Sequence, residues 1–83
     1  MEFKLLVDAD VYDIVSQFAA RKRNRFYAQF RNIQRYPANC SDGVVIDSDG
    51  RQLDVSVFEG HDIRYWVDMA DRHVKILELE KNE

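Results

Sequence analysis

The chain has 83 residues, with 12 Lys or Arg, 15 Asp or Glu and 46% apolar residues. This length allows one small domain over residues 1–83, and the apolar fraction is too high for a disordered chain. The net charge of −3 argues against a protein that simply coats nucleic acid, and the single cysteine excludes a disulfide framework. Without a membrane-length apolar run or a secretory signal, we expect a cytoplasmic protein with no membrane partner.

The N-terminal segment predicts a strand followed by a short helix. The apolar run Phe3–Val7 is typical of a buried strand. Asp10 is the expected N-cap of the helix, because its carboxylate can accept a hydrogen bond from a free N–H group of the first turn. Apolar residues then recur at helical spacing, at Val11, Ile14, Val15 and Phe18.

The next segment predicts a longer helix over about residues 20–36. Pro37 marks its end, because the residue before a proline is displaced from helical geometry. The core-facing stripe of this helix consists of Phe26, Phe30 and Ile33.

The charges are segregated along the chain. Residues 14–41 carry a net charge of +6, whereas residues 1–13 and 42–83 carry −3 and −6. A basic block within an acidic protein produces a local field that favours an acidic partner. We therefore expect partner contacts at four arginines on the solvent side of the second helix: Arg21, Arg25, Arg31 and Arg35.

From Gly43 onward the hydrophobic period changes to two, which predicts strands. Residues 44–46 and 53–57 are joined by a hairpin at Asp49-Gly50, and residues 62–68 and 73–80 are joined by a short loop. We expect Gln52, Asp54 and Ser56 on the outer face. The predicted order is β-α-α-β-β-β-β, an α+β fold in which a helical hairpin packs on one face of a mostly antiparallel sheet.

The outer face of this sheet is the candidate site. A four-residue loop between the last two strands pairs Trp66 with Lys75 and Asp68 with His73, on the same face as Arg64. Contact between the Trp66 ring and the Lys75 ammonium would contribute about 0.5–1 kcal/mol at an exposed site. Such a mixture of charged and aromatic groups suits binding of a peptide or a nucleic acid strand.

RNA cleavage without a metal needs a cation to stabilise the phosphorane and a group that transfers protons. The candidate catalytic residues are Arg64, His73, Lys75 and, near the sheet edge, Arg51. We expect no cofactor and no metal, because neither histidine stands at a metal-ligand spacing with Cys40 or with the other histidine.

The last strand changes phase along its length. Val74 and Ile76 share one face, whereas Leu77 and Leu79 share the other. A β-bulge would bring the two pairs into one phase; alternatively, Leu77 and Leu79 lie under the chain of a partner. We favour the partner, and we include Trp66, Leu77 and Leu79 among the residues expected to contact it.

The whole pattern resembles the RelE/ParE family of toxins from bacterial type II toxin–antitoxin systems. The resemblance is carried by residues 10–15, 21–25, 60–68 and 73–79. It implies a small cytoplasmic toxin that a co-encoded antitoxin neutralises, with a role in plasmid stabilisation. RelE-like members are mRNA interferases that cleave mRNA on the ribosome, and ParE-like members inhibit DNA gyrase.

The sequence departs from the family pattern at the expected active site. His61-Asp62 stands where the family has a Tyr-Arg type of motif, and the C-terminal His-Arg and Tyr segment of active nucleases has no counterpart. Two hypotheses follow: a metal-independent endoribonuclease that acts on the ribosome, and a non-catalytic binding module that engages an antitoxin, gyrase or another protein. A third is an interaction domain unrelated to toxins.

Overall fold

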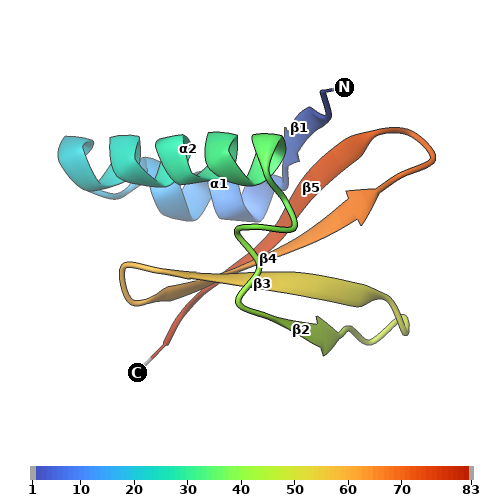
Figure 1. Cartoon of the computed structure of the whole chain (residues 1–83). Coiled ribbons are helices and arrows are strands. Elements are labelled where there is room, and N and C mark those ends of the chain that lie inside the picture. The colour runs from blue at the N-terminus through green and yellow to red at the C-terminus, as the bar shows by residue number, and fades with distance from the viewer. Residues whose placement is uncertain (1, 83) are drawn as a thin grey trace.

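The computed structural model describes residues 2–82. The elements are β1 (Lys4–Val7), α1 (Ala9–Ser16), α2 (Ala20–Arg35), β2 (Gly43–Ile46), β3 (Gln52–Phe58), β4 (His61–Asp68) and β5 (His73–Lys81). Both helices lie on the same side of the strands (Figure 1), and no helix of residues 2–82 covers the other face of the sheet. The predicted α+β class and element order are confirmed.

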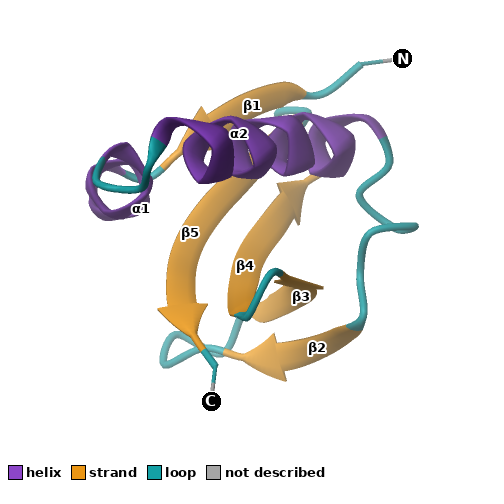
Figure 2. Cartoon of the chain, turned by 90° about the vertical axis from the view of Figure 1, so that its left-hand side faces the viewer, coloured by secondary structure: helices purple, strands orange, loops and turns teal. Residues whose placement is uncertain are grey.

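The sheet has the strand order β1-β5-β4-β3-β2. β1 pairs with β5 in parallel, and every other pair is antiparallel. The chain must cross from β1 at one edge to β2 at the other, and α1 and α2 fill this connection. Figure 2 shows the result, with the helices packed across the sheet and β2 far from them at the opposite edge.

The hydrophobic core lies between the helices and the sheet. The stripe predicted on α2 is confirmed, because Phe26, Phe30 and Ile33 are all buried. Its partners are Val11 and Val15 of α1 and, from the sheet, Ile63, Tyr65, Val74, Ile76 and Leu79.

Helix α1 begins earlier than predicted. Asp8, not Asp10, is the N-cap: its backbone is non-helical, and its Oδ1 accepts the N–H of Asp10 at 2.9 Å. Asp10 already lies in the first turn, where its negative charge is favourable near the positive end of the helix dipole. α1 ends at Ser16, so Phe18 lies beyond the helix and the predicted apolar stripe is shorter. Ile14, another member of the predicted stripe, is 40% exposed.

The face of strand β3 that lies toward the helices is the opposite of the predicted one. Ser56 lies opposite Ile63 and shares its face, so Ser56 is buried under α2, where Gln29 Nε2 donates to its Oγ at 3.1 Å. The cause is the turn at Glu59-Gly60, where both residues have a positive φ and thereby fix the register of the hairpin. Val57 consequently lies on the open face.

The pairing of β4 with β5 confirms the predicted register at its start and breaks it further on. Trp66 lies opposite Lys75 and Asp68 opposite His73, as predicted. Arg64, however, pairs with Glu78 instead of Leu77, because the register shifts between Arg64 and Tyr65. Leu77 is the extra residue of a β-bulge.

The bulge decides which side chains of β5 reach the core. Leu79 turns toward the helices and is only 9% exposed, so its expected place under a partner chain on the outer face is wrong. Glu78 and Glu80 turn instead to the open face, opposite Arg64 and Asp62. Leu77 stays partly exposed beside α1, in a shallow hollow of about 240 Å³, and its contact with a partner remains a prediction.

Candidate functional site

The open face of the sheet carries all four candidate catalytic residues, and two of them meet at one aromatic ring. The Lys75 Nζ lies 4.8 Å from the centre of the Trp66 ring, which confirms the predicted contact. Arg51 immediately precedes β3, and its guanidinium group lies 5.2 Å from the centre of the same ring. Each contact contributes about 0.5–1 kcal/mol and holds its cation beside the indole.

Lys75 and Arg51 are also held by carboxylates. Lys75 Nζ lies 3.4 Å from Asp68 Oδ2, and Arg51 Nε lies 3.0 Å from Asp47 Oδ2. The backbone N–H groups of Asp49 and Arg51 both donate to Asp47 Oδ1 at 2.9 Å. These bonds, the one from the Arg51 backbone above all, lower the pKa of Asp47. In the hairpin loop between β2 and β3, Arg51 is therefore ion-paired with Asp47 and is not a free cation.

Arg64 lies between the two glutamates that the bulge brings outward. Its NH1 group is 3.1 Å from Glu80 Oε2 and 3.5 Å from Glu78 Oε1. Partial burial disfavours the charge of this side chain, but hydrogen bonding and charge attraction from Glu80 and Glu78 outweigh burial and raise the pKa of Arg64. Its Nε is buried without a hydrogen-bond partner.

The loop between β4 and β5 gathers three potential metal ligands. One ligand atom each of Asp68, Asp71 and His73 lies within 4.8 Å of the others. The Asp71 N–H donates to Asp68 Oδ1 at 3.2 Å and, together with Lys75, lowers the pKa of Asp68. The Lys75 ammonium beside Asp68 opposes a second cation there. The arrangement is an ion-paired turn, and the expectation of no metal remains a prediction.

His61 and Tyr65 belong to the helix side of the sheet. His61 packs edge-on against Phe18 and Phe26, with ring centres 5.5 and 5.2 Å apart. The Tyr65 hydroxyl donates to the Pro37 carbonyl, and burial raises the pKa of its phenol. Neither residue contributes a proton-transfer group to the open face.

The four arginines of α2 differ in what they contact. Arg25 donates to both carboxylate oxygens of Glu59, at 2.7 and 2.9 Å, and so joins α2 to the β3–β4 turn. Arg31 donates to Gln34 Oε1 at 3.0 Å. Across residues 2–82, the side chains of Arg21 and Arg35 form no hydrogen bond or ion pair. Three of these four arginines therefore keep an unneutralised charge.

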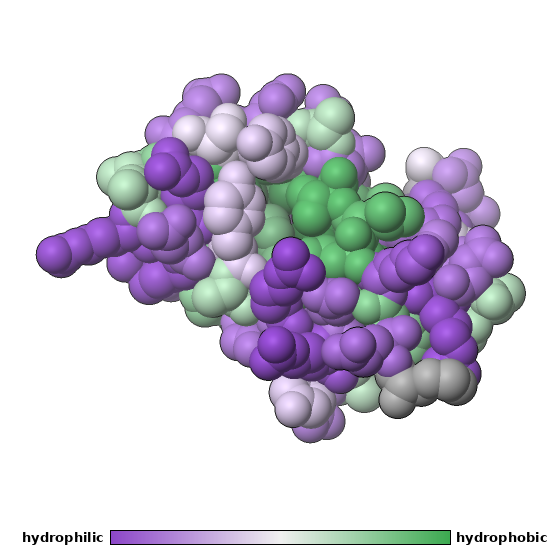
Figure 3. All heavy atoms as spheres, turned by 90° about the horizontal axis from the view of Figure 1, so that it is seen from above, coloured by the Kyte–Doolittle hydropathy of each residue, from purple (hydrophilic) through white to green (hydrophobic). Residues whose placement is uncertain are grey.

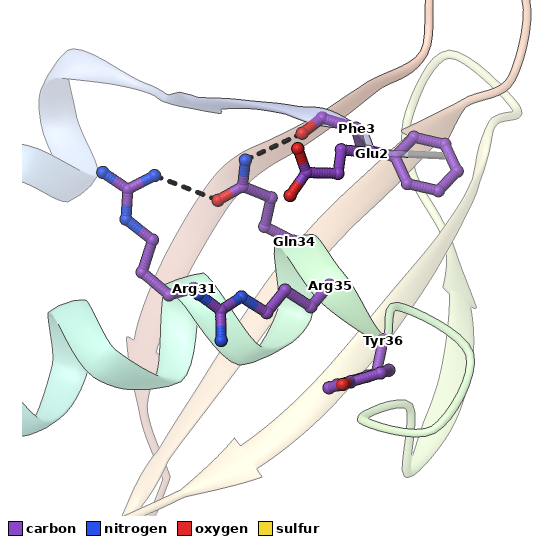
Figure 4. A pocket seen from close by; sticks show the side chains of 6 residues that line it. All are labelled: Glu2, Phe3, Arg31, Gln34, Arg35 and Tyr36. Carbon is purple, nitrogen blue, oxygen red and sulfur yellow. Dashed lines mark hydrogen bonds between the residues drawn. The ribbon is translucent and has the colours of Figure 1, made fainter.

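Arg31 and Arg35 border a pocket of about 400 Å³ between the N-terminal segment and the end of α2 (Figure 4). Gln34 ties its two walls together, because its Nε2 donates to the Phe3 carbonyl at 2.7 Å while its Oε1 accepts from Arg31. Glu2 and Tyr36 complete the lining. Sequence patterns did not indicate this pocket, because its walls are about 30 residues apart in the chain.

A second hollow of about 400 Å³ lies beside the first and is largely apolar. Its lining consists of Leu5, Val7, Tyr12, Tyr27, Phe30 and Arg31. The rings of Tyr12 and Tyr27 stack with their centres 6.5 Å apart. Seen from the helix side, hydrophobic atoms gather in a hollow bordered by hydrophilic ones (Figure 3). Arg31 lines both hollows.

No protein-family model matches the chain, and no curated protein matches it in sequence. In structure it is similar to a chain of the crystal structure of the archaeal RelE–RelB complex from Pyrococcus horikoshii OT3, with a TM-score of 0.77 over 98% of this chain and 96% of that one. The chain has a RelE-like fold. At 17% identity the likeness extends to the fold alone. No helix within residues 2–82 is long and apolar enough to cross a membrane.

Proposed function

We propose that the chain is the toxin-like member of a toxin–antitoxin pair and that it acts by binding proteins rather than by cleaving RNA. The RelE-like fold supports the first part, since a structural neighbour is a chain of a RelE–RelB complex. The expected partner is accordingly an antitoxin protein. The chemistry of the open face supports the second part.

The observation that carries this choice is the β-bulge at Leu77, which turns Glu78 and Glu80 to the open face beside Arg64. An RNA backbone that approaches β4 and β5 meets more carboxylates than cations. Its phosphates must displace a carboxylate to reach each cation. The acids of this surface are Asp62, Asp68, Glu78 and Glu80, against Arg64 and Lys75. Cleavage would require an excess of positive charge there, to stabilise the phosphorane.

Two observations favour ribosome-dependent mRNA cleavage as a second candidate. Trp66 is partly exposed and contacts two cations, and nucleic acid bases stack on such aromatic rings. The His73 Nδ1 also lacks a hydrogen-bond partner. Under this hypothesis Arg51, Arg64, His73 and Lys75 would form the catalytic group.

Inducible expression in a bacterium tests the proposal, with growth, mRNA 5′ ends and DNA supercoiling followed together. We expect growth arrest without new mRNA ends, at equal strength in the wild type and in the Arg64→Ala/Lys75→Ala variant. A change in supercoiling would identify gyrase as the target. Lys81 is an exposed base of β5, and the Lys81→Ala variant is the matched control.

Two results would contradict the proposal. A folded, expressed chain without any effect on growth would remove the toxin-like role. New mRNA ends that disappear in the Arg64→Ala/Lys75→Ala variant, but persist in Lys81→Ala, would establish the nuclease hypothesis instead.

A further inference from the structure

The two hollows beside α2 form one surface, which we call the α2 groove: the apolar hollow of Leu5, Val7, Tyr12, Tyr27 and Phe30, and the basic pocket of Arg31 and Arg35. Because Arg31 lines both hollows, the apolar and the basic parts adjoin. The groove lies on the helix side of the sheet, away from the candidate catalytic residues.

The apolar part of the groove leaves large side chains open to solvent in a small domain. Tyr12 is 56% exposed, although its ring stacks on Tyr27. The edge strand β1 contributes Leu5 and Val7, which are only partly buried against the core. Exposed apolar hollows rimmed by polar residues are typical of protein interaction sites.

The arginines of the basic part of the groove are not ion-paired, although Glu2 also lines this part. Arg25 on the same helix has Glu59 as its partner, whereas Arg31 and Arg35 form no ion pair within residues 2–82. Their spacing of four residues places both side chains on one side of α2. Glu2 lines the pocket without an ion pair to either arginine. Two unneutralised guanidinium groups favour carboxylates, which they can bind in bidentate fashion.

We propose that the α2 groove binds an acidic segment of the partner protein, with apolar side chains in the hollow and carboxylates on Arg31 and Arg35. The identification of this partner as the antitoxin rests on the proposed function. The acidic and apolar character of the segment is inferred from the groove alone. A protein segment fits better than RNA, because Leu5, Val7 and the exposed Tyr12 ring offer apolar surface that phosphate and sugar cannot use.

The test selects binders of the intact protein from a displayed library of random 16-residue peptides. We expect enrichment of Asp and Glu together with Leu, Ile or aromatic residues. The synthetic peptide with the tightest binding is then labelled with fluorescein and titrated by fluorescence anisotropy, and a 16-nucleotide single-stranded RNA is titrated in parallel. Peptide affinity should fall as salt rises, since exposed charge pairs are screened.

Matched variants locate the binding site. Arg31→Glu/Arg35→Glu should weaken peptide binding about tenfold or more, because like charges then face each other. Arg72→Glu/Lys81→Glu changes the charge by the same amount at positions outside the groove and should weaken peptide binding less than about threefold. Tyr12→Ser tests the apolar part. Thermal unfolding of each variant verifies that it is folded.

Several outcomes would overturn the proposal: no enriched peptide, selected peptides that are not acidic, equal losses in the two charge variants, or tighter binding of the RNA than of the peptide. Because none of these readouts involves toxicity, they are separate from the proposed function. Growth arrest without groove binding would overturn the groove alone, and groove binding without growth arrest would overturn the toxin-like role alone.

Discussion

At the scale of single residues, the cations of the open face are held by carboxylates that the fold itself positions. Asp68 is the clearest case, because its carboxylate accepts the Asp71 N–H and also faces the Lys75 ammonium. Asp47 plays the same part for Arg51. From the sequence, Lys75 and Arg51 are candidate catalytic groups. In the structure, both are held in ion pairs with these carboxylates.

These contacts predict a loss of stability in acid. The pKa values of Asp47 and Asp68 are lowered in the folded protein, so the unfolded chain binds more protons. Their contribution is complete above the unfolded pKa of about 4 and is lost as the pH falls through the lower folded values. We expect the melting temperature, measured by circular dichroism, to fall steeply below about pH 4.

Asp68→Asn serves as the comparison in the same titration. This variant lacks the titrating carboxylate but keeps an acceptor for the Asp71 N–H, so its melting temperature should fall less between pH 5 and pH 2 than that of the wild type. An identical decline in both proteins would show that Asp68 contributes no pH-dependent stability.

At the scale of elements, the patterns that were predicted correctly are those set by local spacing. The stripe of Phe26, Phe30 and Ile33 follows from the helical period, and the pairing of Trp66 with Lys75 follows from the short loop between their strands. The same kind of alternation predicted the wrong phase for β3, since Val55 and Val57 lie opposite Arg64 and Asp62 on the open face. Burial of Ser56 depends on Gln29, which lies far away in the chain.

The bulge was one of two predicted alternatives, and the α2 groove was not predicted. The sequence indicated a bulge or a partner at Leu77 and Leu79, and only the pairing of Arg64 with Glu78 decides between them. In the groove, Arg31 and Arg35 were predicted as contacts from charge alone, but the tyrosines beside them come together only through tertiary packing.

The bulge predicts different costs for truncating the two leucines of β5. Leu79→Ala should lower the free energy of unfolding by about 2–4 kcal/mol, because it removes a core side chain and leaves a cavity. Leu77→Ala, in a partly exposed position, should cost about 1 kcal/mol or less. Urea denaturation of both variants measures the difference; equal costs would contradict the bulge.

At the scale of the whole molecule, the two sides of the sheet differ in chemistry. The helix side combines the apolar hollow with unneutralised arginines, and the open side pairs its cations with an excess of carboxylates. This division is the basis of the proposal that a partner binds on the helix side. Four acids of residues 42–83 lie on the surface where a ribonuclease would need positive charge: Asp62, Asp68, Glu78 and Glu80.

The central claim, that the open face does not cleave RNA, is tested most directly with the purified protein in a cell-free bacterial translation extract. The 5′ ends of a defined mRNA are mapped before and after addition of the protein, with Arg64→Ala/Lys75→Ala as the matched variant. The account predicts no new ends with either protein. New ends at defined positions in the reading frame, present with the wild type and absent with the variant, would contradict it.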